Sequence, residues 1–173
     1  DPGLELDVVL DAGQVVSGLI RDFAGAPVID VDIDVDYVSG GRLYTPGDNT
    51  DLTGAYRVVV PSGLHRLRFE PVRGSRLLGA EIDSVDVTVD AVVDVTLETG
   101  FLLQGNIADD LGAPATDVDI DFRDALTGAK IYLANNSTDV DGNFVVAVPS
   151  GEFELRFTPP RASSLVAVSR PGF

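Results

Sequence analysis

Hydrophobic and polar residues alternate along most of the chain, in short runs. Between residues 31 and 35 valine and isoleucine alternate with aspartate, and residues 56–60, 66–69, 85–89 and 93–97 follow the same two-residue period. This period is typical of a β-strand with one buried face. No window has a sustained apolar period of 3.6 residues, so the pattern predicts an all-β protein.

Turn-forming residues separate these runs. Glycine, proline, asparagine and aspartate favour the backbone conformations of tight turns. The clearest turn signals are Gly25-Ala26-Pro27, Ser39-Gly40-Gly41, Pro46-Gly47-Asp48, Pro61-Ser62-Gly63 and Asp141-Gly142. The chain is therefore expected to consist of short strands joined by turns.

The whole pattern occurs twice. Residues 30–34 (DVDID) recur as residues 117–121, and 15 of the 31 positions from 7 to 37 are identical to the residue 87 positions later. After a one-residue shift, 13 of the 25 positions from 49 to 73 are identical at a separation of 88. About seven strands in each unit predict two tandem Greek-key β-sandwiches.

The repeat also predicts the boundaries of the units. We name residues 13–99 repeat 1 and residues 100–173 repeat 2. Residues 4–10 match residues 91–97, the closing strand of repeat 1, so residues 1–12 are expected to carry a surplus closing strand. Repeat 2 ends at Phe173, which aligns with Val85, so we expect it to lack a closing strand of its own.

Two arrangements would fill this vacancy. The chain is a segment of a longer covalent array, as the absence of any methionine also indicates, or each copy donates its first strand to the incomplete sandwich of the next copy. In both cases the strand pairs outside its own first repeat. The apolar residues predicted to form this assembly interface are Leu4, Leu6, Val8, Leu10, Leu165, Val166 and Val168.

The motifs resemble those of the carboxypeptidase regulatory-like domain, a seven-stranded sandwich of the transthyretin (prealbumin) type. The resemblance covers nearly the whole chain. It is carried in repeat 1 by residues 17–22 (SGLIRD), 25–27 (GAP), 50–56 (TDLTGAY), 61–63 (PSG) and 93–97 (VDVTL), and in repeat 2 by residues 104–109 (QGNIAD), 112–114 (GAP), 138–144 (TDVDGNF) and 149–151 (PSG). Such domains serve as spacers, accessory modules and surface-protein repeats, so the resemblance implies a fold more than a function.

Charge and composition exclude several function classes. The chain has 28 acidic and 12 basic residues and a formal net charge of −16, which repels nucleic acids and anionic lipid surfaces. No apolar run approaches the roughly 18 residues of a membrane span. With no cysteine and a single histidine, His65, which we expect to pack in the core, the sequence predicts neither a catalytic centre nor a cofactor.

Three groups of residues are candidates for other chemistry. The aspartates of residues 30–36 and 117–121 could ligate calcium, but neighbouring side chains on one strand face run parallel and do not converge. We interpret them as a solvated strand face, paired in part with Arg66, Arg68 and Arg156. Asp139 and Asp141 resemble part of a calcium-binding loop, but a turn also explains this spacing. Asn135 and Asn136 begin overlapping sequons for N-glycosylation.

These observations favour a structural repeat protein of an extracellular or cell-surface fibre or array, whose partners are copies of itself or adjacent repeats of the same polypeptide. The alternative is a non-catalytic polysaccharide-binding module attached to an exported enzyme. Exposed, clustered aromatic residues would favour that alternative, but the candidate tyrosines, Tyr37, Tyr44 and Tyr132, are few and scattered.

Overall fold

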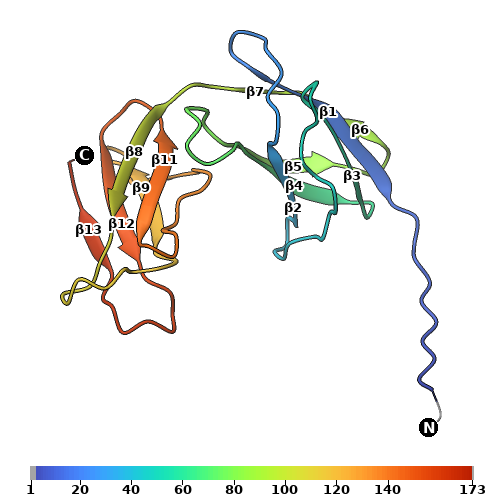
Figure 1. Ribbon diagram of the computed structural model, residues 1–173. Helices are drawn as coiled ribbons and strands as arrows, with labels where there is room; N and C mark the ends of the chain where they lie inside the picture. Colours follow the sequence, from blue (N-terminus) through green and yellow to red (C-terminus); the bar gives the residue numbers. More distant parts are fainter. Residues whose placement is uncertain (1–2, 173) are drawn as a thin grey trace.

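The computed structural model describes residues 3–172, and within this range the chain forms strands, turns and bends but no helix (Figure 1). The prediction of an all-β protein is confirmed. Consequently, residues 3–172 contain no helix of sufficient length and hydrophobicity to span a bilayer. Phe173, at the expected end of repeat 2, lies outside the described residues.

Repeat 1 is built from two sheets. The first is centred on β1, which pairs with β3 in antiparallel orientation along one edge and with β6 and β7 in parallel orientation along the other. The second has the order β2-β4-β5, and all its pairs are antiparallel. The strands are β1 (Gln14–Asp22), β2 (Asp32–Tyr37), β3 (Ala55–Val60), β4 (Leu64–Glu70), β5 (Ala80–Asp86), β6 (Ala91–Val92) and β7 (Val95–Leu97).

Repeat 2 has the same two-sheet plan with fewer strands. One sheet contains only β8 and β11, and the other has the order β10-β9-β12-β13. The strands are β8 (Phe101–Asn106), β9 (Asp119–Asp124), β10 (Lys130–Ile131), β11 (Asn143–Val148), β12 (Phe153–Thr158) and β13 (Val168–Arg170).

Each repeat has its own hydrophobic core, drawn from both of its sheets. In β4, Leu67 and Phe69 are fully buried, whereas Arg66 and Arg68 lie on the opposite face, as the two-residue period predicts. The equivalent core of repeat 2 includes Phe122, Phe144 and Leu155. Burial of these alternating side chains supplies the main favourable free energy of each sandwich.

Buried turn contacts repeat as closely as the sequence does. The Thr50 hydroxyl donates to the carbonyl oxygen of Val28 at 2.8 Å and accepts from the Val31 amide at 2.9 Å. Thr138 makes the same pair of contacts, to Ala115 at 2.7 Å and from Val118 at 2.9 Å. The two repeats therefore share local geometry, and equivalent positions can be compared residue by residue.

Two expected strands are shorter than the sequence pattern indicates. The run at residues 85–89 leaves the sheet after Asp86, and Val89 is exposed. The apolar run at residues 165–168, which contains the predicted interface residues of repeat 2, forms a strand only from Val168, because residues 159–167 form a loop. Two adjacent prolines start this loop, and the Leu165 amide donates to the Ser163 hydroxyl within it.

Candidate functional site

The free edge of β8, the groove beside it and the segment before β1 form the candidate functional site. Its geometry is best understood from repeat 1, where the equivalent edge of β1 is occupied. There Val16 lies opposite Ala91, and Ile20 lies opposite Val95, in parallel register. Between these pairs the Val93 amide donates to the Ser17 carbonyl oxygen at 2.8 Å.

The closing strand of repeat 1 is held by side chains as well as by the sheet. The Asp94 carboxylate accepts from the Leu19 amide at 2.8 Å, and the Tyr56 hydroxyl donates to the Val93 carbonyl oxygen at 2.8 Å. Burial, reinforced by the nearby charge of Asp94, raises the pKa of Tyr56 well above its ordinary value. The Tyr56 hydroxyl therefore stays protonated and keeps donating at neutral pH.

Val93, which lies between β6 and β7, comes very close to β1. A Cβ atom added to Gly18 would lie 2.0 Å from the Val93 carbonyl oxygen, so only glycine permits the contact. Repeat 2 retains glycine at the equivalent position, Gly105, where an added Cβ would meet the Phe144 ring at 2.7 Å. β8 therefore has glycine at the position where β1 accommodates its closing strand, and in repeat 2 this glycine accommodates the Phe144 ring.

The equivalent edge in repeat 2 is open. Among the described residues, β8 pairs only with β11, and nothing occupies the position that β6 and β7 take in repeat 1. A groove of about 540 Å³ lies here instead. Its lining includes Asn106, Ile107, Phe157, Leu165, Val166 and Val168.

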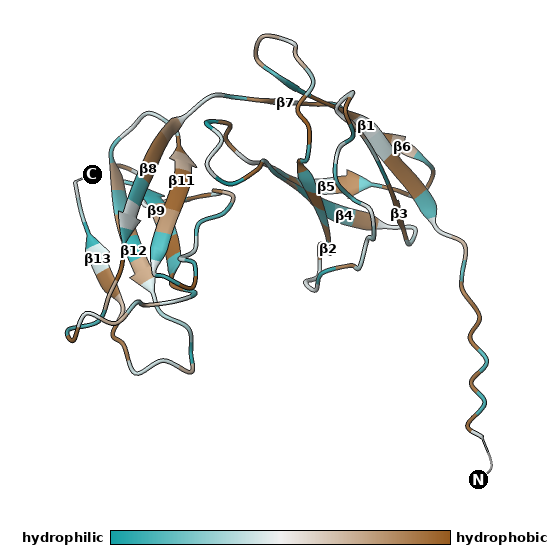
Figure 2. Ribbon diagram, in the orientation of Figure 1, coloured by the Kyte–Doolittle hydropathy of each residue, from teal (hydrophilic) through white to brown (hydrophobic). Residues whose placement is uncertain are grey.

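The segment before β1 runs away from the body of the molecule as an extended chain (Figure 1). Its side chains are exposed and alternate between hydrophobic and hydrophilic (Figure 2). The predicted interface residues of this segment, Leu4, Leu6, Val8 and Leu10, thus lie in solvent rather than against their own chain. The structure gathers Leu165, Val166 and Val168 at the groove but does not bring residues 4–10 to it within one chain.

The acidic strands are partly buried and paired, and not simply solvated. Asp34 is only 3% exposed and forms ion pairs with Arg42 and Arg68, and Arg68 also bonds Asp36 at 2.7 Å. Lys130 lies 2.5 Å from Asp121. Arg42 and Lys130 were not among the predicted partners, although they are 88 residues apart and therefore equivalent in the two repeats.

The other predicted arginine partners are placed differently. Arg66 pairs with Asp83 at 2.9 Å, on the neighbouring strand β5, and Arg156 pairs with Glu154 at 3.0 Å on its own strand. Burial next to Asp121 raises the pKa of Asp119, while Lys130 opposes this shift. Of the three predicted arginines, only Arg68 pairs with an aspartate of the acidic strand in its own repeat.

The two calcium candidates lie in a hydrogen-bonded turn. The Asp139 carboxylate accepts from the amides of Asp141 and Asn143 at 3.0 and 2.8 Å. In repeat 1, Asp51 makes the equivalent turn, and hydrogen bonds from Thr53 lower the pKa of Asp51. Within residues 3–172 no three His, Cys, Asp or Glu side chains converge as a metal site would require.

His65 is buried, as expected, with its Nε2 atom 2.7 Å from the Pro61 carbonyl oxygen. Both sequon asparagines are partly buried and use their amide groups in hydrogen bonds: Asn135 donates to Pro71, and Asn136 donates to Asp119 and Ile120. Glycosylation would require these bonds to break.

The three tyrosines do not share a surface. Tyr37 packs against His65, with ring centroids 5.6 Å apart. Tyr132 is partly buried and donates to the Glu70 carboxylate at 3.1 Å, and burial raises its pKa above the ordinary value. Tyr44, by contrast, is 89% exposed. The structure therefore offers no aromatic platform made by these tyrosines for a polysaccharide.

Comparison with known proteins gives matches in structure alone. No protein-family model matches the chain, and no curated protein matches it. Among solved structures, the chain is similar to the Bacillus anthracis TIE protein at 12% identity, with 94% of this chain and 32% of that chain covered and a TM-score of 0.39.

Two pilins are similar to about the same degree. For a Streptococcal ancillary pilin the identity is 13%, the coverage is 92% of this chain and 58% of that chain, and the TM-score is 0.36. For the shaft pilin SpaA of Lactobacillus rhamnosus GG the identity is 8%, the coverage is 92% of this chain and 94% of that chain, and the TM-score is 0.37. The chain thus spans about a third and somewhat over half of the first two structures.

Proposed function

We propose that this protein is a non-catalytic structural module of a cell-surface or extracellular array, and that its modules join head to tail by strand complementation. One observation carries the proposal. The edge of β8 is open, and unpaired residues 4–10 match the sequence of the strand that fills the same edge in repeat 1. The partner is a second copy of this chain.

The register of the added strand follows from repeat 1. Shifted by 87 residues, the pairs of β1 with β6 and β7 place Leu4 beside Leu103 and Val8 beside Ile107 of the second copy, in parallel orientation. The Asp94 contact becomes one in which Asp7 accepts from the amide of Asn106. Each of these contacts has an equivalent in repeat 1, 87 residues away in the numbering.

The hydrophobic effect favours this pairing. In repeat 1, alternate positions of residues 91–97 face inward, with Leu97 buried and Ala91, Val93 and Val95 partly buried. The equivalent residues Leu4, Leu6, Val8 and Leu10 therefore face the groove, while Glu5, Asp7 and Val9 face solvent. Full burial of one such side chain is worth about 1.5 kcal/mol or more, so four partly buried chains supply several kcal/mol.

The proposal is tested by placing charge on the inward face. The full chain is expected to associate in a concentration-dependent manner in sedimentation-velocity experiments. The double variant Leu6→Asp/Val8→Asp should remain monomeric, because it replaces two of the apolar contacts that favour the pairing by carboxylates that are costly to bury. Its far-ultraviolet circular dichroism should match that of the wild type, because residues 4–10 do not contribute to the fold of their own repeat.

Val9→Asp is the control, since it adds a carboxylate to the outward face of the same segment; the single variant Val8→Asp adds the same charge to the inward face. We expect Val9→Asp to associate like the wild type. A wild-type chain that stays monomeric at every concentration, or equal loss of association in Val9→Asp and Leu6→Asp/Val8→Asp, would contradict the proposal. Protease accessibility of the protein on intact cells tests the cell-surface location separately.

A further inference from the structure

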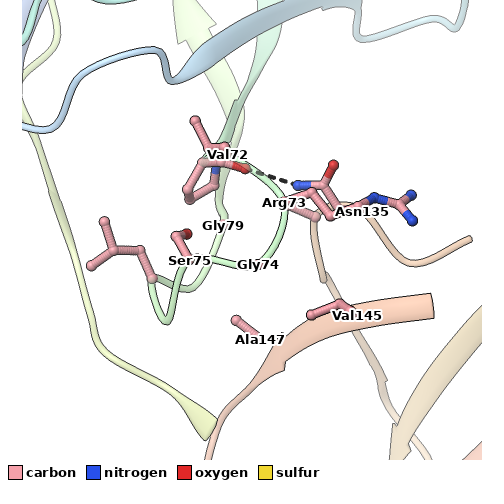
Figure 3. Close-up of a pocket in the computed structure, with 11 residues that line it drawn as sticks. Val72, Arg73, Gly74, Ser75, Gly79, Asn135, Val145 and Ala147 are labelled. Atoms are coloured by element: carbon pink, nitrogen blue, oxygen red, sulfur yellow. Dashed lines mark hydrogen bonds between the residues drawn. The ribbon is translucent and has the colours of Figure 1, made fainter. Parts of the chain in front are cut away.

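The two repeats of one chain contact each other through a defined interface. Loop 71–79 of repeat 1 faces Asn135 and the β11 residues Val145 and Ala147 (Figure 3). Asn135 donates to the Pro71 carbonyl oxygen at 2.8 Å, and Tyr132 donates to the Glu70 carboxylate at 3.1 Å. The interface therefore joins the β4–β5 connection of one repeat to the loop that contains Tyr132 in the next.

The linker between the repeats, residues 98–100, also takes part in this interface through backbone hydrogen bonds. Residues 98–100 run antiparallel to residues 76–78 of the loop. The Leu78 amide donates to Glu98 at 2.8 Å, and the Gly100 amide donates to Arg76 at 2.6 Å. These bonds use backbone atoms and set the direction in which repeat 2 leaves repeat 1. They require glycine at position 100, where an added Cβ would lie 2.5 Å from the Val148 carbonyl oxygen.

Repeat 1 carries an unused copy of the second half of this interface. Tyr44 is equivalent to Tyr132 and Pro46 to Ala134, and the Arg42–Asp34 ion pair is equivalent to that of Lys130 with Asp121. We call residues 42–48 the head surface. Ala134 is 8% exposed, whereas Pro46 and Tyr44 are exposed, the latter at 89%. The head surface is therefore exposed, whereas the equivalent residues of repeat 2 are covered by loop 71–79 of repeat 1.

Repeat 2 carries an unused copy of the first half. Residues 158–167, which we call the tail surface, are equivalent to residues 70–79 and keep Pro159, Arg161, Ser163 and Leu165 at the matching positions. Pro71 is buried and Leu78 partly buried. Their counterparts are more exposed, since Pro159 is partly exposed and Val166 is 84% exposed. One chain therefore presents complementary halves of the same interface on opposite repeats.

We infer that the head surface of one copy docks on the tail surface of the preceding copy, with the contacts that join the two repeats within a chain. The inference rests on the proposed function, because strand complementation brings the two surfaces together. Residues 11–13 link the added strand to β1 just as residues 98–100 link β7 to β8, and both linkers end in glycine. A linker of equal length places the next repeat in the same orientation.

The resulting array repeats nearly the same junction at every sandwich, within a chain and between chains. The junction between copies is slightly wider, because Ala167 and Pro46 replace Gly79 and Ala134 there and a Cβ at position 79 would lie 2.8 Å from the Ala134 Cβ. Backbone bonds from Val166 to Asp11 and from Gly13 to Ser164 replace those of Leu78 and Gly100. Two side-chain contacts change at the junction between copies. Thr158 replaces Glu70 as the acceptor for the tyrosine hydroxyl, and Gly47 replaces Asn135, which leaves Tyr44 as the main anchor.

Disulfide trapping tests the docking directly, because the native chain contains no cysteine. A Cβ added to Gly79 would lie 2.8 Å from the Ala134 Cβ, closer than the roughly 3.5–4.5 Å of a disulfide, so a slight opening of the interface brings this pair into bonding range. The equivalent positions across the junction are Ala167 and Pro46. Full-length Ala167→Cys and Pro46→Cys chains, mixed and oxidised, should form a cross-linked heterodimer. A single chain with Gly79→Cys and Ala134→Cys is the positive control for the geometry.

Glu152→Cys mixed with Pro46→Cys is the negative control. Glu152 is exposed but lies beyond the opposite end of β12, about 20 Å from Thr158 at the rise of a β-strand. We expect little cross-linking from this pair. Equal cross-linking from Glu152 and Ala167, or none from Ala167, would overturn the inference.

The two proposals can fail separately. If the wild type associates and Leu6→Asp/Val8→Asp does not, but Ala167 fails to cross-link to Pro46, the strand pairing stands and the docking is wrong. If nothing associates, both are wrong. A second measurement uses Tyr44→Ala, which should weaken association about tenfold, whereas Tyr44→Phe should retain most of it because the ring provides the buried area.

Discussion

Tyr56 and Phe144 occupy equivalent positions in the two repeats and differ by one hydroxyl group. The Tyr56 hydroxyl bonds the Val93 carbonyl oxygen in the closing strand of repeat 1. Phe144 has no such group, and in the described chain no strand lies where the hydroxyl would point. The effect of adding or removing this hydroxyl therefore reports how much its hydrogen bond stabilises a closing strand.

Tyr56→Phe should lower the free energy of unfolding of repeat 1 by about 1–2 kcal/mol, because the Val93 carbonyl oxygen loses a buried donor. Chemical denaturation followed by circular dichroism measures this change. Since the pKa of Tyr56 is raised in the folded state, wild-type stability should also fall as the pH rises above the ordinary tyrosine value, and Tyr56→Phe should reduce that fall. Tyr44→Phe, at an exposed position, is the control and should change stability by less than about 0.5 kcal/mol.

At the scale of elements, the contrast between β1 and β8 governs assembly. Among residues 3–172, β1 has partners on both edges and β8 on one, although both strands have glycine at the equivalent positions 18 and 105. An unpaired, partly apolar edge is a site for pairing with another chain. The element that can pair there without steric conflict is one with the sequence pattern of residues 91–97.

Phe144→Tyr should strengthen association, because the added hydroxyl would reach the carbonyl oxygen of Leu6 in the strand of the second copy. A net hydrogen bond of about 1 kcal/mol corresponds to roughly fivefold tighter binding. Sedimentation equilibrium measures the dissociation constant. In the Leu6→Asp/Val8→Asp background the same substitution should have no effect on association. Unchanged affinity of Phe144→Tyr in the wild-type background would argue against the proposed register.

At the scale of the whole molecule, net charge opposes both folding and assembly. With a formal charge of −16, like charges repel within one chain and between copies, and salt screens this repulsion. The melting temperature and the extent of association should both rise between low and moderate sodium chloride. Differential scanning calorimetry and sedimentation velocity measure the two effects.

Calcium chloride at matched ionic strength is the control for this experiment. Asp139 and Asp51 already accept hydrogen bonds within their turns, so we expect calcium to act only through its contribution to ionic strength. An additional rise of several degrees at millimolar calcium would show a specific metal site and would contradict this expectation.

The sequence alone determined the all-β fold, the two-fold repetition and the match between residues 4–10 and 91–97. It could do so because strand periodicity, turn residues and internal identity are local properties of the chain. It also predicted which faces of β4 would be buried, since a two-residue period fixes Leu67 and Phe69 on the side opposite Arg66 and Arg68.

Other features depended on the tertiary structure. The ion pairs of Arg42 with Asp34 and of Lys130 with Asp121 depend on how neighbouring segments align across the sheet, and Tyr132 is half-buried beside Glu70, 62 residues away. Above all, Tyr44 and Tyr132 occupy equivalent positions in the two repeats, yet Tyr44 is exposed and Tyr132 is partly buried. Burial depends on what lies across the interface, and only the three-dimensional arrangement of the two repeats decides that.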